Sequence, residues 1–183
     1  FEAAVKEGEV EAVMGAYNRT LGEPCCGSDL LIRKILRGKW GFQGHFVSDC
    51  WAISDFHLHH HITTTAPESA ALAIKMGCDV NCGNTYLHLL RALEDGLITE
   101  DDITTAAERL FTTRFMLGEF DENCEYNSIP YEVVECPEHL ALSEEAARRS
   151  VVLLKNDGIL PLDKAKIKRS EERRVGKECR SRW

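Results

Sequence analysis

The chain has 183 residues, of which 44% are hydrophobic and 28% are charged, and its formal net charge is −8. This composition is that of an ordinary globular protein and excludes a collagenous or wholly disordered chain. The acidic charge argues against a nucleic-acid partner, because binding phosphates requires a basic surface, and no apolar run reaches the roughly 18 residues that a membrane span needs. The length suffices for a sizeable core but not for a complete (β/α)8 barrel, which takes roughly 250 residues.

Three short apolar runs with adjoining polar residues predict strands: Ala12–Ala16, His45–Val47 and Asp79–Cys82. None of them alternates regularly between apolar and polar residues, which favours strands that are covered on both faces.

Helical patterns separate and follow these runs. They predict helices over Ser28–Arg37, from Thr65 to Gly77, from Thr85 to Gly96 and from Thr99 to Gly118. The second of these helices has a capping-box signature with an early proline, and a glycine at its end. Alternating strands and helices predict right-handed βαβ units, and therefore a parallel α/β architecture.

The pattern changes after residue 118. Turn-prone groups over residues 119–135 predict a linker, and a helix is expected over Pro137–Ser150. The run Val151–Leu154 then predicts a buried strand, which would be the first of a second domain.

The last fifteen residues, Arg169–Trp183, contain six Lys or Arg and three Glu in an otherwise acidic chain. A basic interaction tail is one interpretation of such a segment. The string also resembles the in-frame translation of a sequencing-adapter oligonucleotide, and we therefore exclude it from the fold prediction. The remaining 168 residues carry 16 Lys or Arg against 27 Asp or Glu, a net charge of −11.

Asp49 is the first candidate for chemistry, because it follows the predicted strand that ends at Val47 and precedes a new segment. In α/β barrels the active site is built at the carboxyl ends of the strands. A carboxylate there can act as a nucleophile, general base or metal ligand. Capping of the next helix is the alternative role.

Several motifs occur around Asp49 in a fixed order: VMGAYN over residues 13–18, LRGKWGFQG over 36–44, FVSD over 46–49 and GCDVNCG over 77–83. Together they resemble family 3 glycoside hydrolases, in particular the branch of β-xylosidases and β-glucosidases. The resemblance extends from about Val10 to Leu162, where VVLLKNDGIL over 151–160 also fits.

The resemblance implies a division of the chain into four segments. Residues 1–118 would be the C-terminal part of a (β/α)8 TIM-like barrel, 119–150 a linker and connecting helix, 151–168 the first strand of an αβα sandwich domain, and 169–183 an artefact. Because the chain starts at Phe1 without Met or a signal-peptide pattern, we expect it to begin inside a larger reading frame.

The function implied by the resemblance is a retaining, exo-acting hydrolysis that releases β-linked xylose or glucose from the non-reducing end of an oligosaccharide, with no cofactor. Asp49 would be the nucleophile that forms a covalent glycosyl-enzyme intermediate, and Tyr17 would lie beside it and hydrogen-bond it. The acid/base Glu and an upstream Lys-His pair would lie outside these residues. We therefore expect the fragment to be inactive on its own.

Two further residues are implied as substrate contacts. Met14 would line the same pocket, with a place in the core as its alternative. Cys50 stands where many relatives carry a Trp of the wall that contacts the leaving group, so the leaving-group subsite is expected to differ here. For Tyr17 the alternative is packing against the core.

The cluster His57–His61 supports a rival interpretation, a non-glycosidase α/β domain that binds a metal. Adjacent histidines rarely converge on one ion, and no H-E-x-x-H spacing is present, so a solvated loop is favoured. The cysteines show no C-x-x-C zinc spacing, and we expect buried free thiols, as in a reducing compartment such as the bacterial cytoplasm. Asp79 is expected to have a structural role, either capping or pairing with an arginine, rather than a catalytic one.

Overall fold

The computed structural model describes residues 1–163 and 165–166. It divides into two compact units, Phe1–Glu125 and Tyr126–Trp183. The adapter-like segment Arg169–Trp183 lies outside the described residues.

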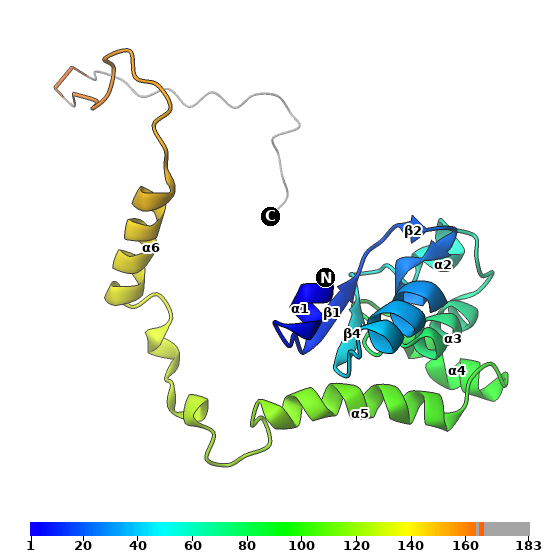
Figure 1. Cartoon of the computed structure of the whole chain (residues 1–183). Coiled ribbons are helices and arrows are strands. Elements are labelled where there is room, and N and C mark those ends of the chain that lie inside the picture. Colours follow the sequence, from blue (N-terminus) through cyan, green and yellow to red (C-terminus); the bar gives the residue numbers. More distant parts are fainter. Residues whose placement is uncertain (164, 167–183) are drawn as a thin grey trace. The chain divides into compact units, whose positions relative to one another are not determined.

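A parallel strand pair forms the centre of the first unit. Strand β1 (Ala12–Gly15) lies beside β4 (His45–Ser48), with Ala12 opposite His45 and Gly15 opposite Ser48 (Figure 1). Val47 forms an isolated parallel bridge to Val80, so the third predicted strand pairs next to β4 through a single bridge rather than a full ladder. The predicted parallel α/β arrangement is confirmed.

The helices of the first unit follow the predicted order with small shifts. They are η2 (Asp29–Lys39, π-helical), α3 (Ala66–Met76), η3 (Thr85–His88) continuing into α4 (Leu89–Glu94), and α5 (Glu100–Met116). Five short helices and strands of this unit were not predicted from the sequence: α1 (Glu2–Lys6), β2 (Arg19–Thr20) paired with β3 (Glu23–Pro24), η1 (Cys25–Gly27) and α2 (Asp55–Leu58).

Local chemistry explains where the longer helices begin and end. Thr65 and Glu68 form the predicted capping box of α3, and Thr99 and Asp102 form one at the start of α5. Each box satisfies backbone N–H groups that the first turn of a helix leaves without partners. Gly77 ends α3 with φ of +95°, a conformation that glycine adopts without the steric cost of a side chain.

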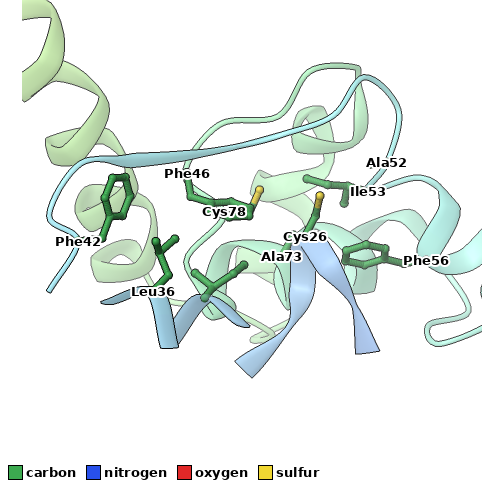
Figure 2. Packing of buried hydrophobic residues seen from close by; sticks show 10 residues of the cluster. Cys26, Leu36, Phe42, Phe46, Ala52, Ile53, Phe56, Ala73 and Cys78 are labelled. Atoms are coloured by element: carbon green, nitrogen blue, oxygen red, sulfur yellow. The ribbon is translucent and has the colours of Figure 1, made fainter. Parts of the chain in front are cut away.

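A hydrophobic cluster joins η2, β4, α2 and α3 (Figure 2). Its most deeply buried large side chains are Ile32, Ile53 and Phe56. Burying a side chain of this size contributes roughly 1.5–3 kcal/mol. A second cluster packs Ala71 and Ile74 of α3 against Ala92, Ile98 and Ala106, so α3 contributes to both clusters.

The second unit contains η5 (Tyr131–Val133) and α6 (Pro137–Ser150), and η4 (Glu125–Ser128) lies at its boundary with the first. The helix α6 has the predicted bounds, but none of its residues is buried. The run Val151–Leu154 forms no strand in the described part of this unit, and its side chains are exposed. A strand needs a hydrogen-bonding partner strand, and the described residues of this unit include none. Among the described residues, no helix is both long and apolar enough to cross a bilayer.

Candidate active site

The carboxyl ends of the parallel segments meet at one edge of the first unit. The backbone N–H of Asp49 donates to Gly15 O at 3.1 Å, and Ser48 N–H donates to Val80 O at 2.9 Å. Trp51 N–H donates to Cys82 O at 2.7 Å. These bonds hold together the residues that follow β1, β4 and the Val80 bridge, which is where α/β proteins place ligands.

Asp49 is half-buried directly after β4. Its Oδ1 accepts a hydrogen bond from Cys50 N–H at 2.7 Å. The next helix, α2, has Ser54 at its N-cap position, so Asp49 does not cap it. The structure therefore does not show Asp49 in its alternative role as a helix cap.

Tyr17 is brought to the same place from the segment after β1. Its hydroxyl donates to the carbonyl oxygen of Cys50 at 2.5 Å. Partial desolvation, and then the negative charge of Asp49, raise the pKa of the Tyr17 phenol. The hydroxyl therefore keeps its proton and remains a donor at neutral pH. Tyr17 is 46% exposed, which is more than packing against the core would allow.

Cys50 and Cys82 form a disulfide across 32 residues of sequence, with a Cα–Cα distance of 4.4 Å. The expectation of free thiols was therefore wrong for these two residues, while Cys25, Cys26, Cys78, Cys124 and Cys136 are free. The error has a physical reason. Cys50 follows β4 and Cys82 follows Val80, and the parallel bridge between these two segments brings the cysteines together. The bond cross-links the backbone on one side of Asp49 to the Val80 segment.

Met14 is not placed with the other candidates. It is 61% exposed on β1 and lines an apolar hollow of ≈ 290 Å³, together with Val13, Ala16 and Trp40 among others. Asp49, Tyr17 and Cys50 do not line that hollow. Met14 is thus exposed rather than a core residue of this unit, and the hollow that it lines does not include Asp49.

Trp51 is a residue at this edge that the sequence reasoning missed. It is 55% exposed and its φ is +68°, an uncommon backbone conformation for a bulky residue. Besides its bond to Cys82, its carbonyl accepts a hydrogen bond from Ser54 Oγ at 2.6 Å. Strained residues that are held in this way tend to occur at functional sites. The available signal was an aromatic residue two positions after the candidate carboxylate.

The histidines of residues 57–61 do not converge. His57 Nδ1 lies 2.9 Å from Ser69 Oγ, and His59 faces Asp55 at 3.6 Å. The ring of His60 stacks on Phe56. Burial, and then the charge of His88, lower the pKa of His57. Within residues 1–163 and 165–166 no group of three or more His, Cys, Asp or Glu is arranged to hold a metal ion, so the rival metal-binding interpretation finds no support there.

Comparison with known proteins gives a consistent result. The model of the "Glycosyl hydrolase family 3 N terminal domain" matches residues 1–113. A xylan 1,4-beta-xylosidase of Xylanibacter ruminicola is 39% identical over 90% of this chain, and a probable exo-1,4-beta-xylosidase of Aspergillus clavatus is 41% identical over 88%. The alignments cover 20% and 22% of those two proteins, so the chain spans about a fifth of their length.

Solved structures show the same similarity. A GH3 exo-beta-xylosidase in complex with a xylobiose aziridine activity-based probe superposes with a TM-score of 0.76 at 31% identity, covering 87% of this chain and 21% of that one. A beta-glucosidase from Listeria innocua in complex with glucose gives a TM-score of 0.72 at 27% identity, covering 88% and 22%.

Proposed function

The chain belongs to glycosyl hydrolase family 3, and we propose that it is part of a retaining, exo-acting glycosidase that releases β-linked xylose or glucose from the non-reducing end of oligosaccharides. The observation that carries the proposal is the position of Asp49, half-buried at the carboxyl end of β4 and beside a protonated Tyr17 hydroxyl. Because several relatives are named as xylosidases, we propose xylose rather than glucose as the main sugar released.

In this proposal Asp49 is the nucleophile. Its Oδ1 accepts the Cys50 N–H, so we assign attack on the anomeric carbon to Oδ2. The bond from that carbon to the leaving sugar breaks as the glycosyl–Asp49 ester forms, and water later hydrolyses the ester. A second carboxyl group about 5 Å away must protonate the leaving oxygen and then activate the water. We assign that role to a Glu outside these residues, as the family resemblance implies.

Tyr17 and the disulfide would position the nucleophile. The Tyr17 hydroxyl and the Cys50–Cys82 bond both act on the residue next to Asp49. This arrangement limits the movement of the carboxylate during attack, and fixed geometry of this kind lowers the barrier of a chemical step. Cys50 therefore acts through its backbone carbonyl and its cross-link rather than as a wall for the substrate.

Trp51 would offer an apolar aromatic surface beside Asp49. Its backbone is held by Cys82 and Ser54, and its side chain is more than half exposed. Aromatic side chains combine a large apolar area with few rotatable bonds. We assign Trp51 to contact with the leaving sugar, which would replace the Trp that many relatives carry one position earlier.

We also propose the domain arrangement that the family resemblance implies. Residues 1–118 would complete a (β/α)8 barrel together with strands outside this chain. Residues 119–150 would connect it to an αβα sandwich that begins within 151–168. The exposed run Val151–Leu154 would gain its partner strands there.

The test uses the whole protein that carries this sequence. A 2-deoxy-2-fluoro xyloside with a good leaving group should inactivate the enzyme and add one glycosyl group, and peptide mass spectrometry should locate it on Asp49. The Asp49→Asn variant should take up no label under the same conditions. Label on any other carboxylate would overturn the assignment of the nucleophile.

A further inference from the structure

A second, polar hollow of ≈ 250 Å³ lies among η2, the end of α3 and the first turns of α5. Asp79, at the amino end of the Val80 segment, lies in its wall, whereas Asp49 follows the carboxyl end of β4. The hollow is thus separate from the candidate active site. All its walls come from the first unit.

The lining of this hollow is basic in an acidic chain. Four cationic side chains line it, Arg33, Arg37, Lys75 and Arg109, against the carboxylates of Asp79 and Asp102. Their formal charges sum to +2. The chain as a whole carries −8, so this local excess of positive charge is a distinct feature of the first unit.

Both carboxylates already have partners. Asp79 accepts hydrogen bonds from Arg37 Nη2 at 2.7 Å, from Arg109 Nη1 at 2.9 Å and from Phe46 N–H at 2.8 Å. Asp102 Oδ2 accepts from the N–H and hydroxyl of Thr99 in the capping box. A buried ion pair needs such additional bonds to offset its desolvation, and these bonds reduce the repulsion that either carboxylate would exert on a bound anion.

One hydrogen-bond donor of Arg37 has no acceptor among the described residues. Arg37 Nη1 and Nη2 donate to backbone carbonyls and to Asp79. Its Nε is buried, and within the described part of the chain it has no hydrogen-bond partner. A buried donor without an acceptor is destabilising, so an acceptor supplied by a ligand would relieve that cost.

Two guanidinium groups approach the backbone at Gly77. Gly77 lines the hollow, and the place where a Cβ would stand on Gly77 is 3.4 Å from Arg37 Nε and 3.8 Å from Arg109 Nη1. The guanidinium groups of Arg37 and Arg109 therefore both lie close to Gly77, on the same wall of the hollow. Guanidinium groups recognise oxyanions through pairs of N–H donors.

We propose that this hollow is a binding site for a small oxyanion, phosphate or a phosphate monoester, held by Arg37 and Arg109 with Arg33 and Lys75 at the rim. This oxyanion site shares no residue with the candidate active site around Asp49. The proposal of oxyanion binding therefore does not depend on the proposed glycosidase function. An oxyanion that binds the folded protein but not the unfolded chain would also raise the stability of the protein by mass action.

The experiment is calorimetric titration of the whole protein with inorganic phosphate and, separately, with glycerol 3-phosphate. Saturable binding of either is expected, and the tighter of the two identifies the source of the phosphate group. The test variants are Arg33→Gln and Lys75→Gln, which remove one charge each from exposed positions. Each is expected to weaken binding about fivefold, the effect of one partly screened charge.

The matched control is Lys34→Gln, which removes the same charge next to Arg33 on η2 from a side chain outside the hollow. It should leave the affinity within about twofold of the unaltered protein, since an exposed charge beyond the site is screened. Absence of saturable binding would overturn the proposal. Equal weakening by Lys34→Gln and by the two rim variants would overturn it as well, because it would show attraction to net charge rather than a site.

Discussion

The hydroxyl of Tyr17 donates a hydrogen bond to the carbonyl oxygen of Cys50, 33 residues further along the chain, at 2.5 Å. This bond links the segment after β1 to the residue that follows Asp49. The disulfide links that same residue to Cys82. A hydrogen bond and a disulfide thus both hold Cys50, the residue next to the candidate nucleophile.

Replacing Tyr17 with Phe removes only this donor. We expect kcat/KM on an aryl β-xyloside to fall by a factor of about 2 to 13, which corresponds to one hydrogen bond of about 0.5–1.5 kcal/mol. The melting temperature should change little because Tyr17 is 46% exposed. Tyr131→Phe, at a residue that is 84% exposed, is the control and should match the unaltered enzyme. Unchanged kinetics in Tyr17→Phe would show that the bond does not position Asp49.

Asp49→Asn keeps the size of the side chain but removes its charge. We expect kcat of the whole protein to drop about a thousandfold or more, as is typical when a covalent nucleophile is lost. Asp101→Asn, at an exposed position in the first turn of α5, should retain activity. Steady-state hydrolysis of the aryl β-xyloside measures both, and a variant at Asp49 with near-normal kcat would exclude it as the nucleophile.

The disulfide should contribute measurably to stability. Replacing both Cys50 and Cys82 with Ser is expected to lower the free energy of unfolding by about 3.7 kcal/mol, the chain-entropy value for a sequence separation of 32 residues. Urea denaturation of the whole protein measures it. Cys124→Ser, at a half-buried free cysteine, should cost much less. Equal losses in the two variants would contradict a structural role for the cross-link.

Asp79 should be far more important to folding than a surface carboxylate. Its side chain is 1% exposed and pairs with Arg37 and Arg109, so Asp79→Asn leaves buried cations uncompensated and should destabilise by about 3–5 kcal/mol. Asp29→Asn, which breaks only exposed pairs with Arg33 and Lys34, should cost no more than about 1 kcal/mol. Chemical denaturation of both variants compares them, and a mild effect at Asp79 would argue against the pairing.

Stability should fall at alkaline pH, in part through Cys26. Burial raises the pKa of the Cys26 thiol from an ordinary 9.0 to about 11. The thiol in the unfolded chain ionises first as pH rises, so its contribution is complete below pH 9 and is lost between about pH 9 and 11. Cys26→Ala should flatten the decline in melting temperature over this range, whereas Cys124→Ala should leave its slope unchanged. An identical slope in Cys26→Ala would contradict the raised pKa.

Much of the fold was predictable because its signals are local. The helix α6 has the predicted bounds, and Thr65 and Thr99 begin α3 and α5 as their spacing to Glu68 and Asp102 indicated. The short elements were missed because segments of two to five residues carry too little periodicity. The strand at Val151–Leu154 was predicted from its apolar run, yet an apolar run forms a strand only where a partner strand is present.

The sequence alone therefore determined the order of strands and helices, the caps, and the place of Asp49 after β4, since each depends on residues within a few positions of one another. Tertiary structure decided which distant residues meet. Tyr17 reaches Cys50 across 33 residues, Cys50 reaches Cys82 across 32, and Asp79 reaches Arg37 and Arg109 across 42 and 30. Parallel pairing brings these segments together, because it aligns strand ends that the chain itself separates by an intervening helix.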